Sequence, residues 1–311
     1  MNLLWVSTRS FFYKKLEQII RDNNITKIIT VSHGYMYYIA TGLAQKHNIK
    51  CYAIHHDLYS NTININKNKV ASFIDPLFAK SYQHNAINFC VSPFMQTMYD
   101  KLFSGKSIVL YPNRDVKATK NYAQEHLITS FNSKTELTFA YLGTIASKPV
   151  LSLIESFANC IGQLGHSLKL LSNINNETIK SLHLEYKNVT VSPWISSDQL
   201  LHYLCNNIDV LVLLQDNEPQ SIDAISINFP SKLTDYTQTG LPILIIGPQA
   251  GSAYKFGKMY ENAFWTVAAD GDIDFDSLKE ILAEMRQYKT RVNMGTEASL
   301  LGEKLFSFSN I

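Results

Sequence analysis

Hydrophobic positions in the first third of the chain switch repeatedly between helical spacing and short β-branched runs. Apolar residues within 12–20 recur as on one face of a helix, whereas the run 27–31 has the length of a buried strand. Strands that alternate with helices in this way predict βαβ units and a parallel sheet. In order, the expected elements are a helix near 12–20, a strand at 27–31, a helix at 37–45, a strand at 50–54, a strand at 86–91, a helix at 93–103 and a strand at 107–111.

The alternation stops in two polar stretches. Residues 61–69 are rich in asparagine and lysine and predict a solvated loop, and 116–135 predict the passage between two domains. The pattern then resumes, with a capping box, Ser196-x-x-Gln199, ahead of one helix. The expected elements there are a strand at 137–142, a helix at 149–165, strands at 168–171 and 189–191, a helix after 196, a strand at 208–214, a helix at 231–238, a strand at 242–246 and two helices within 276–309.

These patterns predict an α/β fold with two Rossmann-like parallel-sheet domains that face a cleft. We place a short N-terminal domain at 1–120 and a second domain at 121–295, with a C-terminal helix at 296–311 that packs back on the N-terminal domain. Ligands are expected where the carboxyl ends of parallel strands and the N-termini of helices converge.

Composition excludes some classes of function. Apolar residues make up 46% of the 311 positions and charged residues 17%, which is typical of a folded globular protein. The formal net charge of +2 argues against a nucleic-acid partner, which would need a concentrated basic face. No signal peptide or long apolar run is present, so we expect a cytoplasmic protein. Reduced, buried thiols are expected at the four separated cysteines, Cys51, Cys90, Cys160 and Cys205.

The most informative stretch of the chain is 228–246, which reads NFPSKLTDYTQTGLPILII. Pro230 suits the first turn of a helix, and Gly240 suits its end before a buried strand. The backbone N–H groups near Ser231 and Lys232 would then point outward with the helix dipole behind them, which favours an anion such as a diphosphate. An ordinary helix-to-strand connection with normal caps explains the same residues, so both interpretations stay open on local physics.

The pattern Phe-Pro-Ser-Lys-Leu-x-Asp-Tyr-x-x-x-Gly-x-Pro at 229–242 resembles the donor-site signature of retaining glycosyltransferases with the GT-B fold, particularly family four. Three further segments follow the order of that family. Residues 141–149 resemble the opening strand and glycine turn of the donor domain, 189–212 its base-binding strand and helix, and 91–113 the end of the first domain. The resemblance is more specific in the second half of the chain.

The resemblance implies a metal-independent reaction without a cofactor, in which a sugar moves with retention from a nucleoside-diphosphate sugar to a hydroxyl acceptor on a glycan or lipid-linked saccharide. It implies that Lys148 neutralises the departing diphosphate, that Asp235 anchors the nucleotide-sugar and that His56 faces the donor sugar. It further implies donor contacts at Gly143, Thr144, Trp194, Pro230, Ser231 and Lys232. His33 and Gly34 follow the strand at 27–31, and from this place at the sheet edge we expect them to contact the acceptor.

The chain departs from the family at two places. Ile227 stands where relatives often carry a glutamate, and Asp235 is a shortened form of the second glutamate. The first domain is short and lacks the glycine-rich acceptor loop of the family. His55 and His56 are adjacent, which leaves the register open, and the neighbouring Asp57 favours His56.

Other functions are compatible with these residues. The chain could be a non-catalytic partner subunit of a glycosyltransferase complex, or a nucleotide-sugar epimerase on the same fold, and peripheral association with the inner face of a membrane stays open. The overlapping Asp-x-Asp triplets in 270–276 are explained more simply by helix capping than by a metal ion. Residues 247–252 have the composition of a phosphate loop, but no convincing helix is expected after them.

Overall fold

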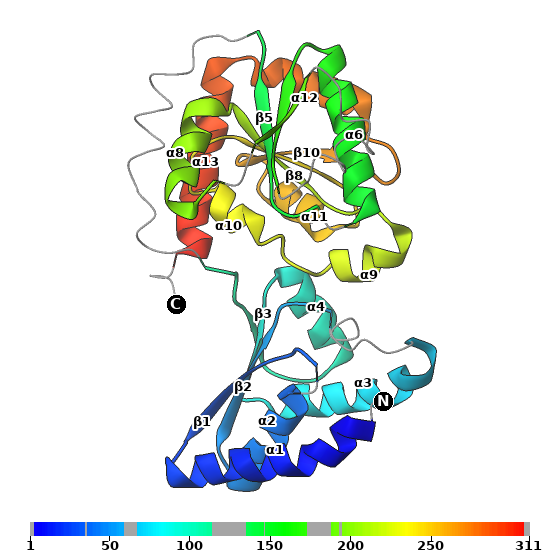
Figure 1. Ribbon diagram of the computed structural model, residues 1–311, viewed down its shortest axis with the longest axis vertical. Coiled ribbons are helices and arrows are strands. Elements are labelled where there is room, and N and C mark those ends of the chain that lie inside the picture. The colour runs from blue at the N-terminus through cyan, green and yellow to red at the C-terminus, as the bar shows by residue number, and fades with distance from the viewer. Residues whose placement is uncertain are drawn as a thin grey trace. The chain divides into compact units, whose positions relative to one another are not determined.

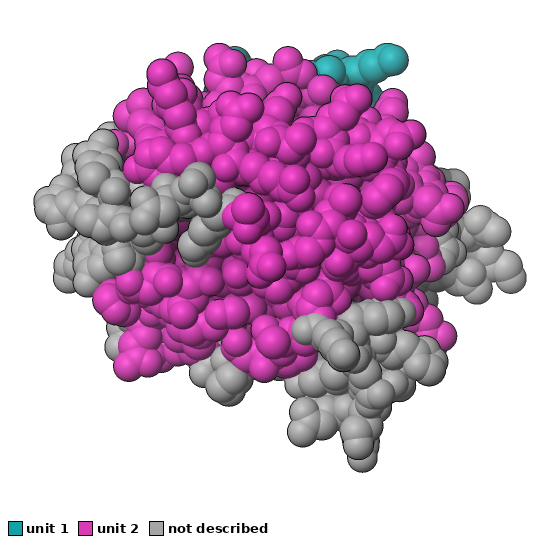
Figure 2. All heavy atoms as spheres, turned by 90° about the horizontal axis from the view of Figure 1, so that it is seen from above, with its two compact units in different colours: residues 1–111, 227–229 teal, residues 112–226, 230–311 magenta. Residues whose placement is uncertain are grey.

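The computed structural model describes residues 3–34, 36–58, 67–113, 135–145, 147–172, 188–192 and 195–307. The chain divides into two compact units, which are drawn in Figure 1 and coloured separately in Figure 2. Unit 1 comprises Met1–Tyr111 with the tripeptide Ile227–Phe229, and unit 2 comprises Pro112–Ser226 with Pro230–Ile311. The domain boundary expected at residue 120 lies outside the described residues.

Unit 1 is built on a parallel sheet with the strand order β1-β2-β3-β4. Because the strands follow one another in a single direction and βαβ crossovers are right-handed, the connecting helices lie on the same face of the sheet. Figure 1 shows α2, α3 and α4 on one side of it. The strands are β1 (Lys27–Val31), β2 (Lys50–His55), β3 (Ile87–Cys90) and β4 (Ser107–Val109), and the helices are α1 (Leu3–Asp22), α2 (Met36–His47), α3 (Lys67–His84) and α4 (Pro93–Leu102).

The covered face of this sheet carries the core of unit 1. On β1, Ile28 packs against the buried cluster of Ile20, Ile39 and Leu43 from α1 and α2. At the end of β2, the ring of His55 lies 5.4 to 5.7 Å from those of three aromatic residues on α3 and α4. These residues are Phe78, Tyr82 and Tyr99.

The helix α3 was missed by the sequence patterns. Residues 67–69, expected to be part of a solvated loop, form its first turn, and the rest of that loop lies outside the described residues. The helix contains Pro76, which removes an intrahelical donor and normally argues against a helix. Apolar contacts to the sheet outweigh that local cost, since Phe78 and Tyr82 of α3 are almost fully buried.

Unit 2 contains a larger parallel sheet with the order β10-β9-β8-β5-β6-β7. The chain first runs outward from β5 to β7, then returns to pair β8 with β5 and continues in the opposite direction. The expected fold class, two parallel-sheet α/β domains, is therefore confirmed. The strands are β5 (Thr138–Leu142), β6 (Ser167–Leu171), β7 (Val189–Ser192), β8 (Val210–Leu214), β9 (Ile243–Gly247) and β10 (Phe264–Ala268).

Helices cover both faces of the unit 2 sheet. One buried cluster joins Phe157 of α6 to Trp265 of β10 and Leu282 of α12. On the other face, Gly295 of α13 lies so close to the backbone of Gly240 that no side chain would fit there. The helices are α6 (Lys148–Gln163), α8 (Ser197–Asn207), η1 (Pro219–Ser221), α9 (Ile222–Ile225), α10 (Lys232–Tyr236), α11 (Ser252–Met259), α12 (Phe275–Met285) and α13 (Tyr288–Phe306).

Two local expectations, the capping box and the loop after β9, turned out differently. Ser196 is the N-cap of α8, but its side chain makes no capping hydrogen bond, so the capping box does not form. The helix α11, which was not expected, follows the loop after β9. The segment 296–311 is, over its described part, the second half of the continuous helix α13, and its Phe306 ring lies 6.3 Å from that of Phe256 in unit 2.

Two expectations about composition can be compared directly with the coordinates. All four cysteines are free thiols, three of them buried. Among the described residues, no helix combines the length and apolar character that crossing a bilayer requires.

Candidate active site

The strand order of unit 2 reverses between β5 and β8, and ligands of open α/β sheets bind beside such a switch point, outside the carboxyl ends of the strands. Tyr236 of α10 joins these two strands. Its hydroxyl accepts a hydrogen bond from the Leu142 amide at 3.1 Å and donates one to the Val212 carbonyl at 3.3 Å. This buried bridge fixes α10, and the residues that open it, beside the switch point.

Lys232, the first residue of α10, extends over the end of β5. Its Nζ donates a hydrogen bond to the Tyr141 hydroxyl at 2.9 Å and lies 4.1 Å from the centre of the Tyr141 ring. The side chain crosses Gly143, where a Cβ atom would stand 2.6 Å from Lys232 Cε. Gly143 also has a φ of 116°, which L-residues rarely adopt. Glycine at this position therefore makes the path of the lysine possible.

Burial lowers the pKa of Lys232 to about 8. The cause is desolvation, which disfavours the cationic form of a lysine that is held away from water. Among the described residues, no carboxylate forms an ion pair with its Nζ. Lys232 is thus a half-buried cation at a switch point, in contact with the hydroxyl and the ring of Tyr141. An anionic ligand would stabilise such a cation.

The backbone amides at the start of α10 are in part bonded to nearby carbonyls and in part not. The amides of Leu233 and Thr234 donate to the carbonyls of Pro230 and Ser231 at 2.9 and 3.0 Å. Within the described chain, the amides of Ser231 and Lys232 make no hydrogen bond. Since the helix has only 5 residues, its dipole is small, and most of the positive charge here belongs to the lysine side chain.

The other proposed donor residues of unit 2 are more exposed. Asp235 lies on the outer side of α10, and Thr144 follows Gly143 in the turn after β5. Lys148 is the first residue of α6, and the preceding Ser147 caps that helix by accepting from the Val150 amide. Trp194, expected at the nucleotide base, lies outside the described residues.

The loop after β9 and the start of α11 are hydrogen-bonded to another part of unit 2. Gln215, which follows β8, accepts a hydrogen bond from the Ala253 amide of α11 at 3.1 Å and donates to the Ser252 hydroxyl at 3.2 Å. A side chain on Gly251 would collide with Gln215. The Ala253 amide at this helix start is therefore already bonded, although the loop has phosphate-loop composition.

In unit 1, the candidate residues lie beyond the carboxyl ends of the neighbouring strands β1 and β2. The rings of His33 and His56 stack with centroids 6.0 Å apart and 18° between their planes. His56 Nε2 lies 3.0 Å from Asp57 Oδ2, and Asn228 Nδ2 donates to Asp57 Oδ1 at 3.2 Å. Gly34 follows with a φ of 60°.

The two adjacent histidines point in opposite directions, as expected for an extended chain. His55 is buried, its Nε2 lies 3.0 Å from Asn88 Oδ1, and burial lowers its pKa to about 4. The side chain of His56 is 40% exposed. Of the two, only His56 can reach a ligand, so accessibility favours the residue chosen from the sequence.

The tripeptide Ile227–Phe229 packs within unit 1. The Ile227 carbonyl accepts a short hydrogen bond from the Ser92 hydroxyl, and the Phe229 ring lies 5.0 Å from that of Tyr111. The side chain of Ile227 is itself buried. A glutamate, which relatives often carry here, would have to place its charge in an apolar environment.

Two groups of residues bear on metal binding. In the part of the chain that is described, His33, His56 and Asp57 form one group of three whose possible ligand atoms lie within 4.8 Å of one another. The second group is the acidic stretch 270–276. Its Asp274 caps the start of α12, because the Asp274 carboxylate accepts a hydrogen bond from the Ser277 amide at 3.1 Å. The expectation of capping is confirmed for Asp274.

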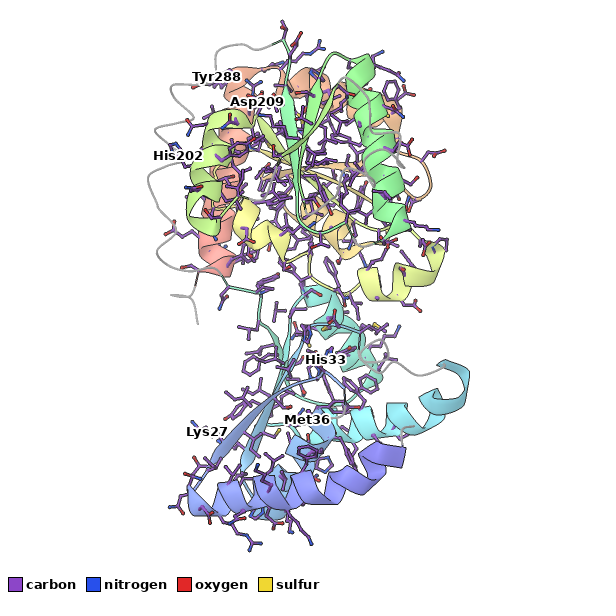
Figure 3. All side chains as sticks on the ribbon, viewed as in Figure 1. Lys27, His33, Met36, His202, Asp209 and Tyr288 are labelled. Carbon is purple, nitrogen blue, oxygen red and sulfur yellow. The ribbon has the colours of Figure 1, made fainter. Side chains whose placement is uncertain are left out.

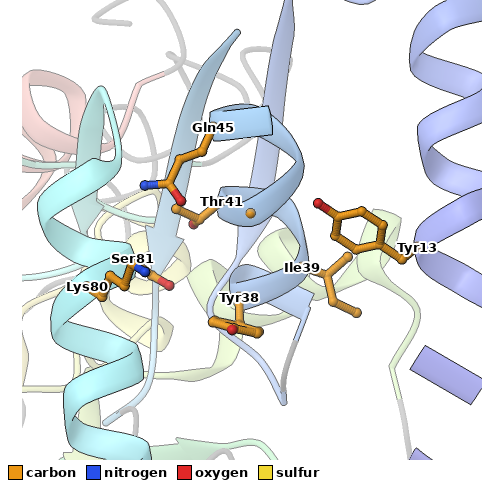
Figure 4. Close-up of a pocket in the computed structure, with 8 residues that line it drawn as sticks. Tyr13, Tyr38, Ile39, Thr41, Gln45, Lys80 and Ser81 are labelled. Carbon is orange, nitrogen blue, oxygen red and sulfur yellow. The ribbon is translucent and has the colours of Figure 1, made fainter. Parts of the chain in front are cut away.

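A separate pocket of about 220 Å³ lies among α1, α2 and α3 of unit 1 (Figure 4). It is lined by Tyr13, Tyr38, Thr41, Gln45 and Lys80, among others. The buried Thr41 hydroxyl already bonds the Tyr37 carbonyl and Asn85. The pocket gathers no cluster of ionisable groups, and we assign it no chemistry.

Three residues of these sites were not singled out from the sequence. Tyr141 and Tyr236 stand inside the segments that resemble the family, but only their hydroxyl partners distinguish them. Asn228 opens the informative stretch 228–246, but its contact with Asp57 joins positions 171 residues apart in the chain and leaves no local pattern.

No protein-family model matches this chain, and no curated protein sequence matches it. Solved structures do match. A complex of Anabaena HepE with UDP is 12% identical, with a TM-score of 0.67 over 95% of this chain and 78% of that one. The glycosyltransferase from Rickettsia africae is 14% identical, with a TM-score of 0.66 over 96% and 77%. Sucrose-phosphate synthase from Thermosynechococcus elongatus is 12% identical, with a TM-score of 0.63 over 98% and 75%.

These neighbours are glycosyltransferases with two parallel-sheet domains. The chain has the GT-B fold. At these identities the likeness establishes architecture, whereas retention, family-four membership and the roles of individual residues depend on the sites themselves.

Proposed function

We propose that this protein transfers a sugar from a nucleoside-diphosphate sugar to a hydroxyl acceptor, and that unit 2 binds the diphosphate at Lys232. The observation that carries the proposal is a half-buried lysine at the switch point of a doubly wound sheet, with no carboxylate partner among the described residues. A structural neighbour was solved with UDP-glucose, which supports a donor of this chemical class.

The reaction gives Lys232 a clear role. As the bond between the anomeric carbon and the diphosphate oxygen breaks, positive charge develops on the sugar and negative charge on the leaving group. A lysine already fixed by Tyr141 would stabilise that negative charge without reorganising during the step. Lys148 would add a second cation and Asp235 a hydroxyl-binding carboxylate, as the resemblance implies.

In unit 1, we propose that His56 forms a hydrogen bond with a hydroxyl of the sugar or the acceptor. Asp57 orients its ring by holding Nε2, and Asn228 in turn holds the other oxygen of Asp57. His33 and Gly34 are proposed to contact the acceptor, which we take to be a glycan or a lipid-linked saccharide. Metal independence and retention complete the proposal. They are checked by turnover in EDTA and by the anomeric configuration of the product.

The first experiment measures UDP binding by isothermal titration calorimetry. Replacing Lys232 with Met removes a charge-assisted hydrogen bond and should weaken UDP binding about 10- to 100-fold. Lys169→Met is the matched control, since Lys169 Nζ also lies over a tyrosine ring, 5.6 Å from the centre of Tyr203. The control should bind UDP as the wild type does.

An unchanged dissociation constant in Lys232→Met, with the variant folded, would remove the proposed diphosphate site. Turnover separates the alternatives that share the fold. Hydrolysis or transfer of UDP-glucose by the purified protein supports a transferase, whereas formation of an epimer without acceptor supports an epimerase. Binding of UDP without either reaction supports a non-catalytic subunit.

A further inference from the structure

One face of the unit 1 sheet carries a continuous apolar surface that the described helices do not cover. We call it the open face. It consists of two rows of register partners, Ile29–Tyr52–Ile87 and Val31–Ile54–Phe89–Ile108. Ile29 is 72% exposed, Val31 42% and Ile108 47%, and the other members are half-buried.

The winding of unit 1 explains why this face is open. Its crossovers all run in one direction, from β1 to β4, so α2, α3 and α4 share the opposite face (Figure 1). In unit 2 the chain also winds back from β8 to β10, and that second half supplies helices to the other face. Parallel sheets are almost always covered on both faces. Unit 1 thus shows half of a doubly wound domain.

The edge of the sheet is open as well. Among the described strands β1 pairs only with β2, so the outer N–H and C=O groups of β1 have no strand beside them. In a doubly wound sheet, the second half of the chain pairs with this edge strand and covers this face of the sheet with helices.

We propose that the open face and the free edge of β1 bind a polypeptide that adds a parallel strand to β1 and packs helices on the open face. This occupant is compatible with the similar GT-B structures, of whose chains this chain covers 75 to 78%. A strand is proposed because another backbone can pair with the row of N–H and C=O groups along the β1 edge. Amphipathic helices are required because two rows of aliphatic and aromatic side chains must be covered.

Two lysines at one border of the open face, which we call its rim, indicate which charge the partner should carry. Lys27 and Lys50 are register partners at the amino end of β1 and β2, and both are exposed. Figure 3 places Lys27 at the end of β1 opposite to His33. The covering helices should therefore carry acidic residues where they pass this rim.

The partner is sought with a photoreactive probe. Benzoylphenylalanine at position 29 of the full chain, produced in its native cells, is irradiated, and the cross-linked polypeptide is identified by mass spectrometry. That polypeptide is then produced together with this chain. A 1:1 complex by light scattering, with slowed hydrogen exchange of the Lys27–Val31 amides, is the expected result.

Substitutions locate the contact. Ile29→Lys with Val31→Lys should weaken the complex about 100-fold or more, because each places a charge in a buried apolar contact. Both positions are already exposed, so the double variant should melt like the wild type. Leu300→Lys on unit 2, where the leucine is 56% exposed, is the control and should leave the complex intact.

Several outcomes would overturn the proposal. They are a cross-link to a second copy of this chain, cross-links to lipid alone, no cross-link, or a complex in which the β1 amides exchange as fast as in the free protein. UDP binding by unit 2 is measured on the same samples. Its retention in the double lysine variant keeps a failure here distinct from a failure of the proposed donor site.

Discussion

At the scale of single residues, the pKa of Lys232 connects the structure of the site with its pH dependence. The folded-state pKa is lowered to about 8, so the lysine is cationic below that pH and loses its proton above it. In the proposed complex a diphosphate contacts the cationic form, so a bound anion should raise this pKa again. Binding and protonation of Lys232 are therefore linked.

We accordingly predict that UDP affinity is nearly constant between pH 7 and about 8 and then falls by up to about tenfold per pH unit. The terminal phosphate of UDP is ionised over this range, because its second pKa is near 6. Calorimetric titrations from pH 7 to 9.5 measure the effect. Lys232→Met should bind weakly and without this pH dependence, and a flat profile in the wild type would contradict the assignment.

At the scale of secondary-structure elements, Tyr236 should couple the stability of α10 to that of the site. Tyr236→Phe leaves the half-buried Leu142 amide without its acceptor, and losing such a partner costs about 1–3 kcal/mol. Urea unfolding should show that loss, with weaker UDP binding. Tyr203→Phe is the control, because the Tyr203 hydroxyl has a half-buried partner in Ser192, 3.3 Å away. Equal effects of both substitutions would remove the special role of Tyr236.

Regular patterns made most elements predictable from the sequence. The strands of both sheets are short apolar runs, and Gly240, with a φ of 66°, ends the segment after α10 as the helix-stop pattern predicts. The helix α3 was missed because a proline and a polar start conceal an amphipathic face. The helix α11 was missed because its N-terminus is satisfied by Gln215, a residue more than 30 positions earlier.

The candidate site was only partly predictable, for a related reason. Two separate sequence segments contain Lys232 and Gly143, but only the structure shows that the lysine side chain passes over the glycine. The anion site was expected from backbone amides, whereas the side chain supplies most of the charge. Contacts such as Asn228 to Asp57 join distant positions and leave no local pattern.

At the scale of the whole molecule, each unit has its own core, and the proposed diphosphate site lies entirely in unit 2. We therefore predict two transitions in calorimetry, of which UDP raises only one. At 100 times the dissociation constant, the ligand contributes about 2.7 kcal/mol, or a shift of about 5–10 °C for a domain of this size.

Core substitutions assign the transitions to the units. Phe157→Leu lies in the unit 2 cluster and should lower the UDP-sensitive transition, whereas Phe78→Leu lies in unit 1 and should lower the other. If UDP raised only the transition that responds to Phe78→Leu, the donor site would have to be moved to unit 1.

The lowered pKa of Lys232 also makes it a nucleophile. At pH 8 about half of its side chains carry a free lone pair, whereas an ordinary surface lysine is almost wholly protonated. Amine-directed acylating reagents should consequently modify Lys232 ahead of Lys148 and Lys169, and saturating UDP should shield it. Peptide mapping after brief acylation, with and without the nucleotide, would show whether the lysine that crosses Gly143 is covered when UDP is bound.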